Sequence, residues 1–467
     1  MNREFKVFDA IIIGAGQGGS PLATSLAKAG WLVALVEREH VGGSCINTGC
    51  TPTKTMIASA RVAHMISKAK DYGINSTLES VDFLKVIKRK QKVVESFRDG
   101  SRNQLLSTQN LSLIEGEARF IGKKQLEVNL PDREKKFIKA DTIIINTGAS
   151  PSKPLIPGLD TSIYLDSTSI MEINKLPRHL LVIGGGYVGL EFGQMFRRFG
   201  SKVTIIQIDK QLLPKEDEDV AQEIAAIFRQ EGIEILLNAE TVKVDTPAKN
   251  KVVLTVKKDN KKQTLEGSHL LVATGRTPNT SALNLESTGI IVNERGYVPV
   301  NDYLETTIPG IFAIGDVKGG PEFTHISYDD YRILSKNILK NEHVSTVGRP
   351  VPYVVFIDPQ LGRIGITEKT AKDLGYEYRV AKMPMSWVAR AIETGETAGI
   401  MKAIVDVKTG QILGVAVLGV EGGEVMAILQ VAMLGGLPYS VIRDTIFSHP
   451  SLSESLNTLF TILDDGK

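Results

Sequence analysis

The chain is poor in cysteine: its 467 residues include only Cys45 and Cys50, which stand in one segment, 42–54, with the sequence GGSCINTGCTPTK. A loop this short gains little stability from a crosslink, so a disulfide that only staples the fold is disfavoured. Zinc needs four ligands and only His64 lies close downstream, so we predict no metal site. We interpret the pair as a redox-active disulfide, and two reduced, buried cysteines are the alternative.

The same segment predicts a helix that begins at the cysteines. Pro52 suits the first turn of a helix, and Lys54 adds a positive charge beside the thiols. The helix dipole and a nearby lysine both lower a thiol pKa from its free value of about 8.5. We therefore expect thiols with a lowered pKa.

Charge imbalance and long apolar runs are missing too. The 55 Lys and Arg residues nearly balance the 53 Asp and Glu residues, and no basic arm suggests nucleic acid. No apolar run approaches the roughly 18 residues of a membrane span. The first six residues lead directly into a predicted strand, so we expect no signal peptide and a cytoplasmic protein. In a reducing compartment such a disulfide is catalytic more often than structural.

A dinucleotide-binding fingerprint lies ahead of the cysteines. Residues 7–13 predict a buried parallel strand that runs into GAGQGG at 14–19, a helix at 20–29 and a strand at 32–36 followed by Glu37. Gly14, Gly16 and Gly19 permit a tight turn and the close approach of a pyrophosphate. Glu37 is placed to accept hydrogen bonds from a ribose.

The fingerprint then repeats, with a strand at 179–183, GGGYVG at 184–189, a helix at 190–199 and a strand at 202–207. The first glycine precedes the strand-end residue by 23 positions in both copies, Gly14 to Glu37 and Gly184 to Gln207. Two such sites imply two different dinucleotides. A nicotinamide gives up a hydride and a flavin can relay the electrons to sulfur, so we expect a flavin between the nicotinamide and the disulfide.

Turn-rich stretches divide a chain whose length allows about three domains. Residues 150–158, SPSKPLIPG, lack the donors for regular structure and mark one crossing, and 274–279 mark the return. After RPVP at 349–352, two strands joined by a turn are predicted at 399–407 and 412–418. Residues 79–98 have helical spacing, and their charges are predicted to form a solvated helix face: Lys85, Lys88, Arg89, Lys90 and Lys92.

Three further motifs carry a resemblance to a known family: ATGRTPN at 273–279, TTIPGIFAIGD at 306–316 and HPSLSE at 449–454. With both fingerprints and the C-x4-C pair, the chain resembles end to end the pyridine nucleotide-disulfide oxidoreductases, which include glutathione reductase, dihydrolipoamide dehydrogenase and mercuric reductase. The resemblance implies an α/β fold with two Rossmann-like domains and a C-terminal α+β dimerisation domain. It places the FAD-binding domain at 1–150 and 277–348, the NAD(P)-binding domain at 151–276 and the dimerisation domain at 349–467.

The resemblance also implies the cofactors, FAD and either NADPH or NADH. Residues expected at the FAD are Gly14, Gly16, Gly19, Glu37, Gly43, Lys54, Thr147, Gly148 and Asp316. Residues expected at the nicotinamide coenzyme are Gly184, Gly186, Tyr187, Gly189, Gln207 and Gly275. Tyr187 matches the gate over the nicotinamide pocket, and the alternative is a tyrosine that only packs at the turn.

Catalytic roles follow from the same resemblance. Cys50 is expected to face the flavin as the charge-transfer thiolate, which leaves Cys45 to attack the substrate. Lys54 and Glu191 match a buried pair beside the reactive flavin nitrogen, where a charged pair stabilises the reduced flavin.

His449 and Glu454 match the family's HPxxxE motif. A histidine, with a pKa near 6.5, can serve both as base for a thiol and as acid for a leaving thiolate, and the glutamate can orient its ring. In relatives this histidine reaches the partner subunit's cysteines. The resemblance therefore implies an obligate homodimer.

Coenzyme choice and electron acceptor are less determined. Gln207 stands where NAD-preferring folds have a carboxylate, yet no arginine pair is ready for a phosphate, so use of both NADPH and NADH is expected. The C-terminus lacks the cysteine pair of mercuric reductases. TPTK at 51–54, FTHISYDDYR at 323–332 and IFSHPS at 446–451 look closest to mercuric-reductase-like flavoproteins of reactive chlorine resistance.

The expected acceptor is therefore a small oxidant such as hypothiocyanous acid, or a metal ion such as copper(II). Three alternatives stay open. They are a reductase of a low-molecular-weight disulfide such as glutathione or lipoamide, a lipoamide-type subunit of a larger complex, and a mercuric reductase.

Overall fold

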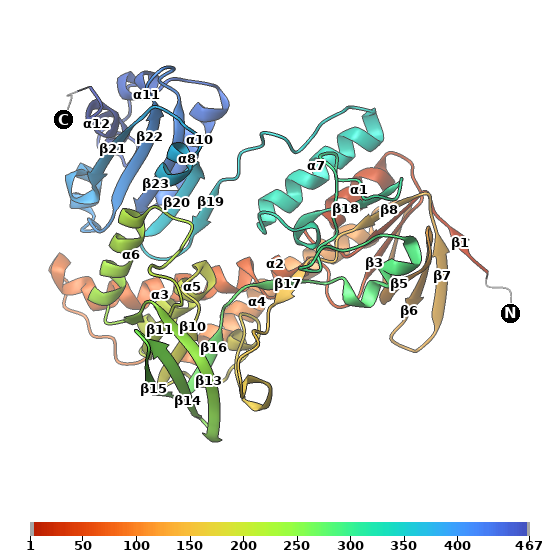
Figure 1. The fold of residues 1–467 in the computed structure, drawn as a ribbon, viewed down its shortest axis with the longest axis horizontal. Helices are drawn as coiled ribbons and strands as arrows, with labels where there is room; N and C mark the ends of the chain where they lie inside the picture. Colours follow the sequence, from red (N-terminus) through yellow and green to blue (C-terminus); the bar gives the residue numbers. More distant parts are fainter. Residues whose placement is uncertain (1–3, 465–467) are drawn as a thin grey trace. The chain divides into compact units, whose positions relative to one another are not determined.

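The computed structural model describes residues 4–464 (Figure 1). The chain divides into two compact units. Unit 1 comprises Met1–Thr55, Lys85–Ser152 and Gly275–Arg349, and unit 2 comprises Met56–Leu84, Lys153–Thr274 and Pro350–Lys467. The three domains expected from the sequence stay a prediction.

Unit 1 is built on a five-stranded parallel sheet in the order β18-β8-β2-β3-β4. Its strands are β2 (Ala10–Ile13), β3 (Val33–Glu37), β4 (Leu111–Glu115), β8 (Thr142–Ile145) and β18 (Ile311–Ala313). The single strand expected at 7–13 is instead two strands, because a short β1 (Lys6–Val7) pairs with another sheet. At the break, Asp9 Oδ2 accepts the amide of Leu32 at 2.7 Å.

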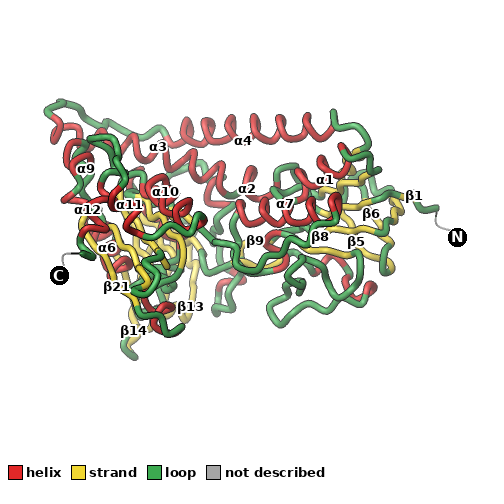
Figure 2. Tube along the Cα trace, turned by 90° about the horizontal axis from the view of Figure 1, so that it is seen from above, coloured by secondary structure: helices red, strands yellow, loops and turns green. Residues whose placement is uncertain are grey.

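The two faces of this sheet bury alternate side chains of β2. Ala10 and Ile12 share a core with α1 (Gly19–Lys28) and α7 (Thr324–Lys340), which pack on each other (Figure 2). Ile11 and Ile13 share a core with the second sheet. This sheet has the order β1-β7-β6-β5, with β5 (Glu117–Gly122), β6 (Gln125–Asn129) and β7 (Lys135–Lys139). Burial on both faces explains the continuous apolar run of β2.

Three helices stand in and after the cysteine segment, and a two-stranded ribbon joins two distant parts of the chain. The helices are α2 (Gly43–Asn47), α3 (Cys50–Lys68) and the long α4 (Phe83–Leu106). On α4 the solvated face is confirmed for four of the five cations but wrong for Lys90, which is 1% exposed. The irregular segment expected from residue 150 begins later, because β9 (Ala149–Pro151) pairs antiparallel with β17 (Arg276–Pro278). Pro151 is tolerated there because both strands of a two-stranded ribbon are edge strands.

Unit 2 contains a parallel sheet in the order β12-β11-β10-β16. Its strands are β10 (His179–Ile183), β11 (Lys202–Ile206), β12 (Glu234–Leu236) and β16 (His269–Val272). The associated helices are α5 (Tyr187–Phe199) and α6 (Glu218–Gln230), and a meander of β13 (Ala239–Ala248), β14 (Lys251–Lys258) and β15 (Lys261–Gly267) follows (Figure 1). The strand, turn, helix and strand of the second fingerprint are confirmed.

The C-terminal part of unit 2 has an antiparallel sheet in the order β19-β20-β23-β22-β21. The strands are β19 (Tyr353–Val355), β20 (Gln360–Gly365), β21 (Tyr378–Pro384), β22 (Ile400–Asp406) and β23 (Ile412–Gly419). The helices are α8 (Glu368–Asp373), α9 (Ala389–Glu393), α10 (Gly422–Leu434), α11 (Tyr439–Asp444) and α12 (Ser455–Thr461). The pair of strands predicted around residues 399–418 is confirmed as β22 and β23.

Candidate active site

The loop that carries the cysteines is pinned by one asparagine. Asn47 Nδ2 donates to the carbonyl oxygens of Val41 and Gly43 at 3.0 and 2.9 Å, and Asn47 Oδ1 accepts from Arg98 Nε at 2.7 Å. Gly43 has φ of +59°, and a Cβ on it would lie 2.8 Å from Gly16 Cα. The cysteine loop therefore packs directly against the first glycine turn, an approach that only glycine permits.

The two cysteines meet as thiols across the junction of α2 and α3. The Cys45 and Cys50 side chains are hydrogen-bonded to each other, and Cys50 Sγ lies 3.5 Å from Thr324 Oγ1. The hydrogen bond to Cys50, then burial, raise the pKa of Cys45, while Thr324 and Lys54 oppose this. The lowered pKa expected for the thiols is therefore wrong for Cys45 in this dithiol form. The charge of Lys54 is outweighed by the hydrogen bond to Cys50 and by burial.

The first glycine turn has the features that a dinucleotide requires. A Cβ on Gly14 would lie 2.3 Å from Asn146 O, and a Cβ on Gly19 would lie 2.2 Å from Gly14 O. Glu37 Oε2 accepts the amide of Ala15 at 2.8 Å, which ties the strand-end carboxylate to the turn. The glycines at the start of α1 leave its first amides without a side-chain cap, as a bound pyrophosphate needs. The turn therefore fits the phosphates of FAD.

Asp316, expected at the FAD, lies in a short helical turn, Gly315–Lys318, among charged partners. Arg276 Nη2 lies 3.4 Å from Asp316 Oδ2, and Arg276 Nε lies 3.5 Å from Glu322 Oε2. Burial raises the pKa of Asp316, and the charge of Arg276 opposes the rise. Glu322 also accepts from Tyr297 at 2.7 Å, and burial raises the pKa of that tyrosine to about 12. Sequence reasoning missed Arg276 as this partner, although the residue stands inside ATGRTPN.

Thr147 and Gly148, which are also expected at the FAD, lie in unit 1 as well. Thr147 Oγ1 donates to Asn279 O at 2.8 Å, and Asn279 Nδ2 donates to Thr147 O at 2.9 Å. Gly148 has φ of +68°, and a Cβ on it would meet no other described atom within 4 Å. Gly275, expected at the nicotinamide coenzyme, has φ of +136° and accepts the amide of Ser152 at 2.9 Å.

The second glycine turn repeats the geometry of the first. A Cβ on Gly184 would lie 2.3 Å from Ala273 O, and a Cβ on Gly189 would lie 2.0 Å from Gly184 O. Gly186 caps α5, and a Cβ on it would meet open space among the described residues. Tyr187 begins α5 with 38% of its surface exposed. This turn fits the pyrophosphate of a nicotinamide coenzyme.

The remaining catalytic candidates are divided between the units. Lys54 lies on α3 in unit 1, whereas Glu191 lies on α5 in unit 2, where its Oε1 accepts the amide of Phe356 at 2.9 Å. Their pairing stays a prediction. His449, in unit 2, has its Nδ1 2.8 Å from Glu454 Oε2, and its side chain is 69% exposed. Glu454 thus holds one ring nitrogen of His449, and the role of this histidine in proton transfer stays a prediction.

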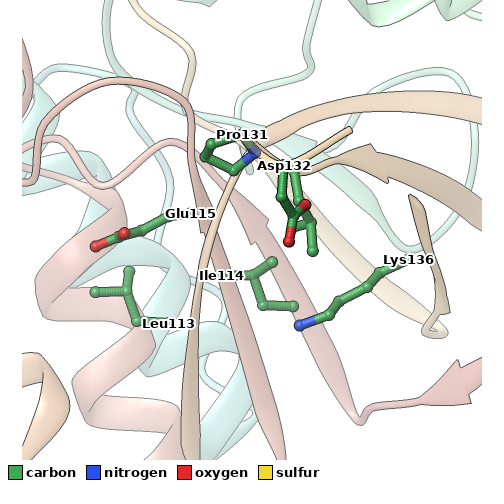
Figure 3. A pocket seen from close by; sticks show the side chains of 7 residues that line it. Leu113, Ile114, Glu115, Pro131, Asp132 and Lys136 are labelled. Carbon is green, nitrogen blue, oxygen red and sulfur yellow. The ribbon is translucent and has the colours of Figure 1, made fainter. Parts of the chain in front are cut away.

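Two clefts and one group of three carboxylates, all formed by residues that the structure describes, contain none of the predicted site residues. A cleft of about 300 Å³ in unit 1 lies between the end of β4 and the turn after β6 (Figure 3). A larger one of about 490 Å³ in unit 2 is lined in part by His64, whose pKa burial and the charge of Arg198 lower to about 4. Three carboxylates in unit 2 have the spacing of a metal site: Asp217, Asp219 and Glu368. The ammonium of Lys402 is bound by all three, so a cationic side chain of the protein already lies among them.

A comparison with known protein families identifies the family to which the chain belongs. Residues 8–330 match the pyridine nucleotide-disulphide oxidoreductases, and residues 351–460 match the dimerisation domain of the same family. The chain therefore belongs to the pyridine nucleotide-disulphide oxidoreductases, flavoprotein enzymes that use FAD and NAD(P)H. Among residues 4–464, none of the helices is long and apolar enough to cross a membrane.

Particular relatives cover nearly the whole chain. The probable pyridine nucleotide-disulfide oxidoreductase RclA of Escherichia coli (strain K12) is 42% identical over 461 residues, 98% of this chain and 99% of the relative. A Bacillus cereus mercuric reductase is 34% identical over 98% of this chain and 72% of the relative, and a Thermus scotoductus dihydrolipoyl dehydrogenase is 34% identical over 97% and 96%. A solved structure, the Cu(II) complex of the HOCl-induced flavoprotein disulfide reductase RclA from Escherichia coli, matches with a TM-score of 0.89 at 42% identity over 99% of this chain and 100% of that chain.

Proposed function

We propose that the protein is a homodimer that passes electrons from NAD(P)H through FAD to Cys45 and Cys50, and on to a small oxidant such as hypothiocyanous acid or to copper(II). One observation carries the proposal: the two thiols are hydrogen-bonded at the start of α3, in a loop packed on the first glycine turn through Gly43. The likeness to a relative described as HOCl-induced, and solved with Cu(II), supports the choice of acceptor.

The first glycine turn, with Gly14, Gly16 and Gly19, would hold FAD, which would supply the chemistry that links a nicotinamide hydride to the reduction of sulfur. Within this chain, Cys45 would then act as the attacking thiolate. Its attack on hypothiocyanous acid forms a sulfur–sulfur bond to thiocyanate and releases hydroxide. Cys50 next attacks the Cys45 sulfur, which expels thiocyanate and forms the disulfide. Two thiols are oxidised, and one molecule of oxidant is reduced.

His449 is the proposed proton donor for that hydroxide, contributed by the partner subunit. Glu454 holds Nδ1, so Nε2 can give a proton and regain it from a thiol. The raised pKa of Cys45 makes a base necessary, because the pair otherwise keeps a proton between its two sulfurs. This role predicts that oxidant reduction depends on His449 more than flavin reduction does.

A steady-state screen of NADH and NADPH oxidation with different acceptors tests the proposal. We expect efficient turnover of hypothiocyanous acid, slow turnover of Hg(II), and a loss of at least about a hundredfold in His449→Ala, the effect typical of a missing general acid. His343→Ala, on an exposed histidine of unit 1, is the matched control. Faster turnover of Hg(II) than of hypothiocyanous acid, or full activity in His449→Ala, would contradict the proposal.

A second candidate is a reductase of a low-molecular-weight disulfide such as oxidised glutathione or lipoamide. The His449–Glu454 pair favours it, because a thiolate leaving group also needs a proton donor. The dihydrolipoyl dehydrogenase relative adds support. Turnover of these disulfides without turnover of hypothiocyanous acid would select this candidate.

A further inference from the structure

Both glycine fingerprints anchor the residue at the end of their second strand in the same way. In the first, Glu37 Oε2 accepts the amide of Ala15 at 2.8 Å. In the second, Gln207 Oε1 accepts the amide of Gly185 at 2.8 Å. Ala15 and Gly185 each follow the first glycine of their turn. The amide oxygen of Gln207 therefore accepts the same backbone hydrogen bond from its glycine turn as the carboxylate oxygen of Glu37 does.

The other end of the Gln207 side chain is chemically different. Glu37 Oε1 is an acceptor, bound by the amide of Glu39 at 2.8 Å, whereas Gln207 Nε2 is a donor and binds Asp209 Oδ2 at 2.6 Å. These two partners fix the orientation of the buried Gln207 amide. A flipped amide would face its NH2 toward the Gly185 N–H and its oxygen toward a carboxylate. Gln207 thus holds the Asp209 carboxylate next to the strand end.

Asp209 restores the negative charge that Gln207 lacks. Sites for NAD place a carboxylate at the end of the second strand, where it accepts from the ribose hydroxyls and repels a 2′-phosphate. The Asp209 side chain is exposed and stands two residues beyond that position, within hydrogen-bonding distance of the residue that occupies it. The end of the second strand therefore has a carboxylate beside it, which Asp209 supplies in place of Gln207.

The loop after the strand has little to offer a 2′-phosphate. Residues 208–217, IDKQLLPKED, include no arginine, the side chain best suited to bidentate phosphate binding. The loop's two lysines, Lys210 and Lys215, are single point charges, and a carboxylate competes for Lys210, whose Nζ lies 3.6 Å from Glu218 Oε2. Gln211 Nε2 donates to the Leu213 and Glu216 carbonyl oxygens at 3.4 and 2.9 Å, so its amide donor already has acceptors within the loop.

We propose that Asp209, held in place by Gln207, makes the protein select NADH over NADPH. The carboxylate favours a coenzyme with free ribose hydroxyls and opposes one whose 2′-phosphate adds at least one further negative charge. The proposal rests on the coenzyme site proposed at the second glycine turn and is independent of the electron acceptor. It narrows the sequence-based expectation that both coenzymes are used.

Dissociation constants of NAD⁺ and NADP⁺ for the oxidised holoenzyme, measured by isothermal titration calorimetry, test the proposal without turnover. We expect the wild type to bind NAD⁺ at least about tenfold more tightly. Asp209→Asn keeps an acceptor for Gln207 Nε2 and removes only the charge. It should tighten NADP⁺ binding and reduce the NAD⁺ preference by about fivefold or more.

Asp245→Asn, which removes a carboxylate from β13 in the same unit, is the control for a general change of charge and should leave the ratio unchanged. Rates of flavin reduction by NADH and NADPH in rapid mixing should show the same order. Tighter or equal binding of NADP⁺ by the wild type, or an unchanged ratio in Asp209→Asn, overturns the proposal. If neither coenzyme binds, the coenzyme site itself is refuted and the selectivity with it.

Discussion

The acidity of Cys45 is set by three neighbours at short range. The hydrogen bond with Cys50 is the largest influence and raises the pKa of Cys45, and burial acts in the same direction. The Thr324 hydroxyl and the charge of Lys54 act in the opposite direction. Thr324 is separated from the cysteines by more than 270 positions in the chain, and its hydroxyl is the neutral group that shares the site with the two sulfurs.

Thr324→Val should make the reduced thiols less acidic, because it removes the hydroxyl that favours the thiolate. Alkylation by iodoacetamide of the enzyme reduced by NADH should slow about threefold to tenfold at neutral pH, since the thiolate is the reactive form. The pH dependence of the alkylation rate checks this. Thr324→Ser keeps the hydroxyl and should behave as the wild type. Equal rates in the valine and serine variants would exclude a role for the hydroxyl.

At this scale the sequence predicts which residues react but not the balance among their neighbours. Cys45, Cys50 and His449 are recognisable because each stands in a short motif. Thr324 and Arg276 are not assignable to their partners from the sequence, because the contacts join positions far apart in the chain. The direction of the Cys45 pKa shift depends on the hydrogen bond with Cys50 and on burial, and spacing in the sequence can supply neither.

The cysteine loop and the first glycine turn act as one packed element. Gly43 adopts φ of +59°, and its Cα approaches Gly16 so closely that a methyl group would lie 2.8 Å from Gly16 Cα. Backbone contacts of this kind cannot relax by a side-chain rotation. The cysteine loop is therefore positioned by the same turn that fits the FAD phosphates.

Gly43→Ala should disrupt this contact and weaken FAD binding by about tenfold or more, because either the loop or the turn must move. Flavin retained after gel filtration, and the thermal midpoint with and without added FAD, measure the effect. Gly73→Ala is a matched control with φ of +74° and no described neighbour within 4 Å of its Cβ. It carries only the left-handed backbone cost of about 1 kcal/mol. Similar flavin loss in both variants would attribute the effect to backbone strain alone.

Elements with a strong period were predictable, and elements that depend on a distant partner were not. The strand at 179–183 is found with those bounds as β10, since the apolar run LLVI directly before a glycine turn favours a buried strand. Residues 149–151 form β9 only because Arg276–Pro278 supplies a partner strand more than a hundred residues away. Lys90 lies on the buried side of α4, where its long stem packs, and the surrounding lysines concealed this in the sequence.

The free energy of unfolding of the whole molecule should depend on pH through one buried acid, Glu216. Glu216 is 7% exposed, its Oε2 lies 3.2 Å from Arg363 Nε, and Tyr353 donates to its Oε1. Burial raises its pKa from 4.5 to about 7, the charge of Arg363 opposes the rise, and Asp217 adds to it. Between these values the folded protein holds a proton that the unfolded chain has lost. Stability contributed by Glu216 therefore falls as pH rises through this window and is constant above it.

Glu216→Gln removes that dependence. The variant should match the wild type at pH 5, where the folded protein holds Glu216 protonated and neutral like a glutamine. Toward pH 8 it should become the more stable of the two by about 1.4 kcal/mol for each unit of the pKa shift. Thermal midpoints of both proteins across pH 5 to 8 measure this. Glu218→Gln, on an exposed pair with Lys210, is the control. A difference that stays constant with pH would show that Glu216 ionises normally in the folded protein.

The proposed homodimer places each active site across two chains, with the cysteines from one and His449 from the other. Chains carrying His449→Ala and chains carrying Cys45→Ser should each be weakly active alone, because every site of either homodimer lacks a required group. In a mixed dimer one of the two sites pairs intact cysteines with an intact histidine. Random subunit exchange gives mixed dimers as half of the population, so activity should recover to about one quarter of the wild type.

Each variant should keep its FAD, because neither residue belongs to the glycine turn. The measurement is hypothiocyanous acid reduction before and after exchange, with the mixed dimer identified by a mass tag. Absence of recovery despite proven exchange would mean that each subunit completes its own site, and that His449 serves the cysteines of its own chain or none.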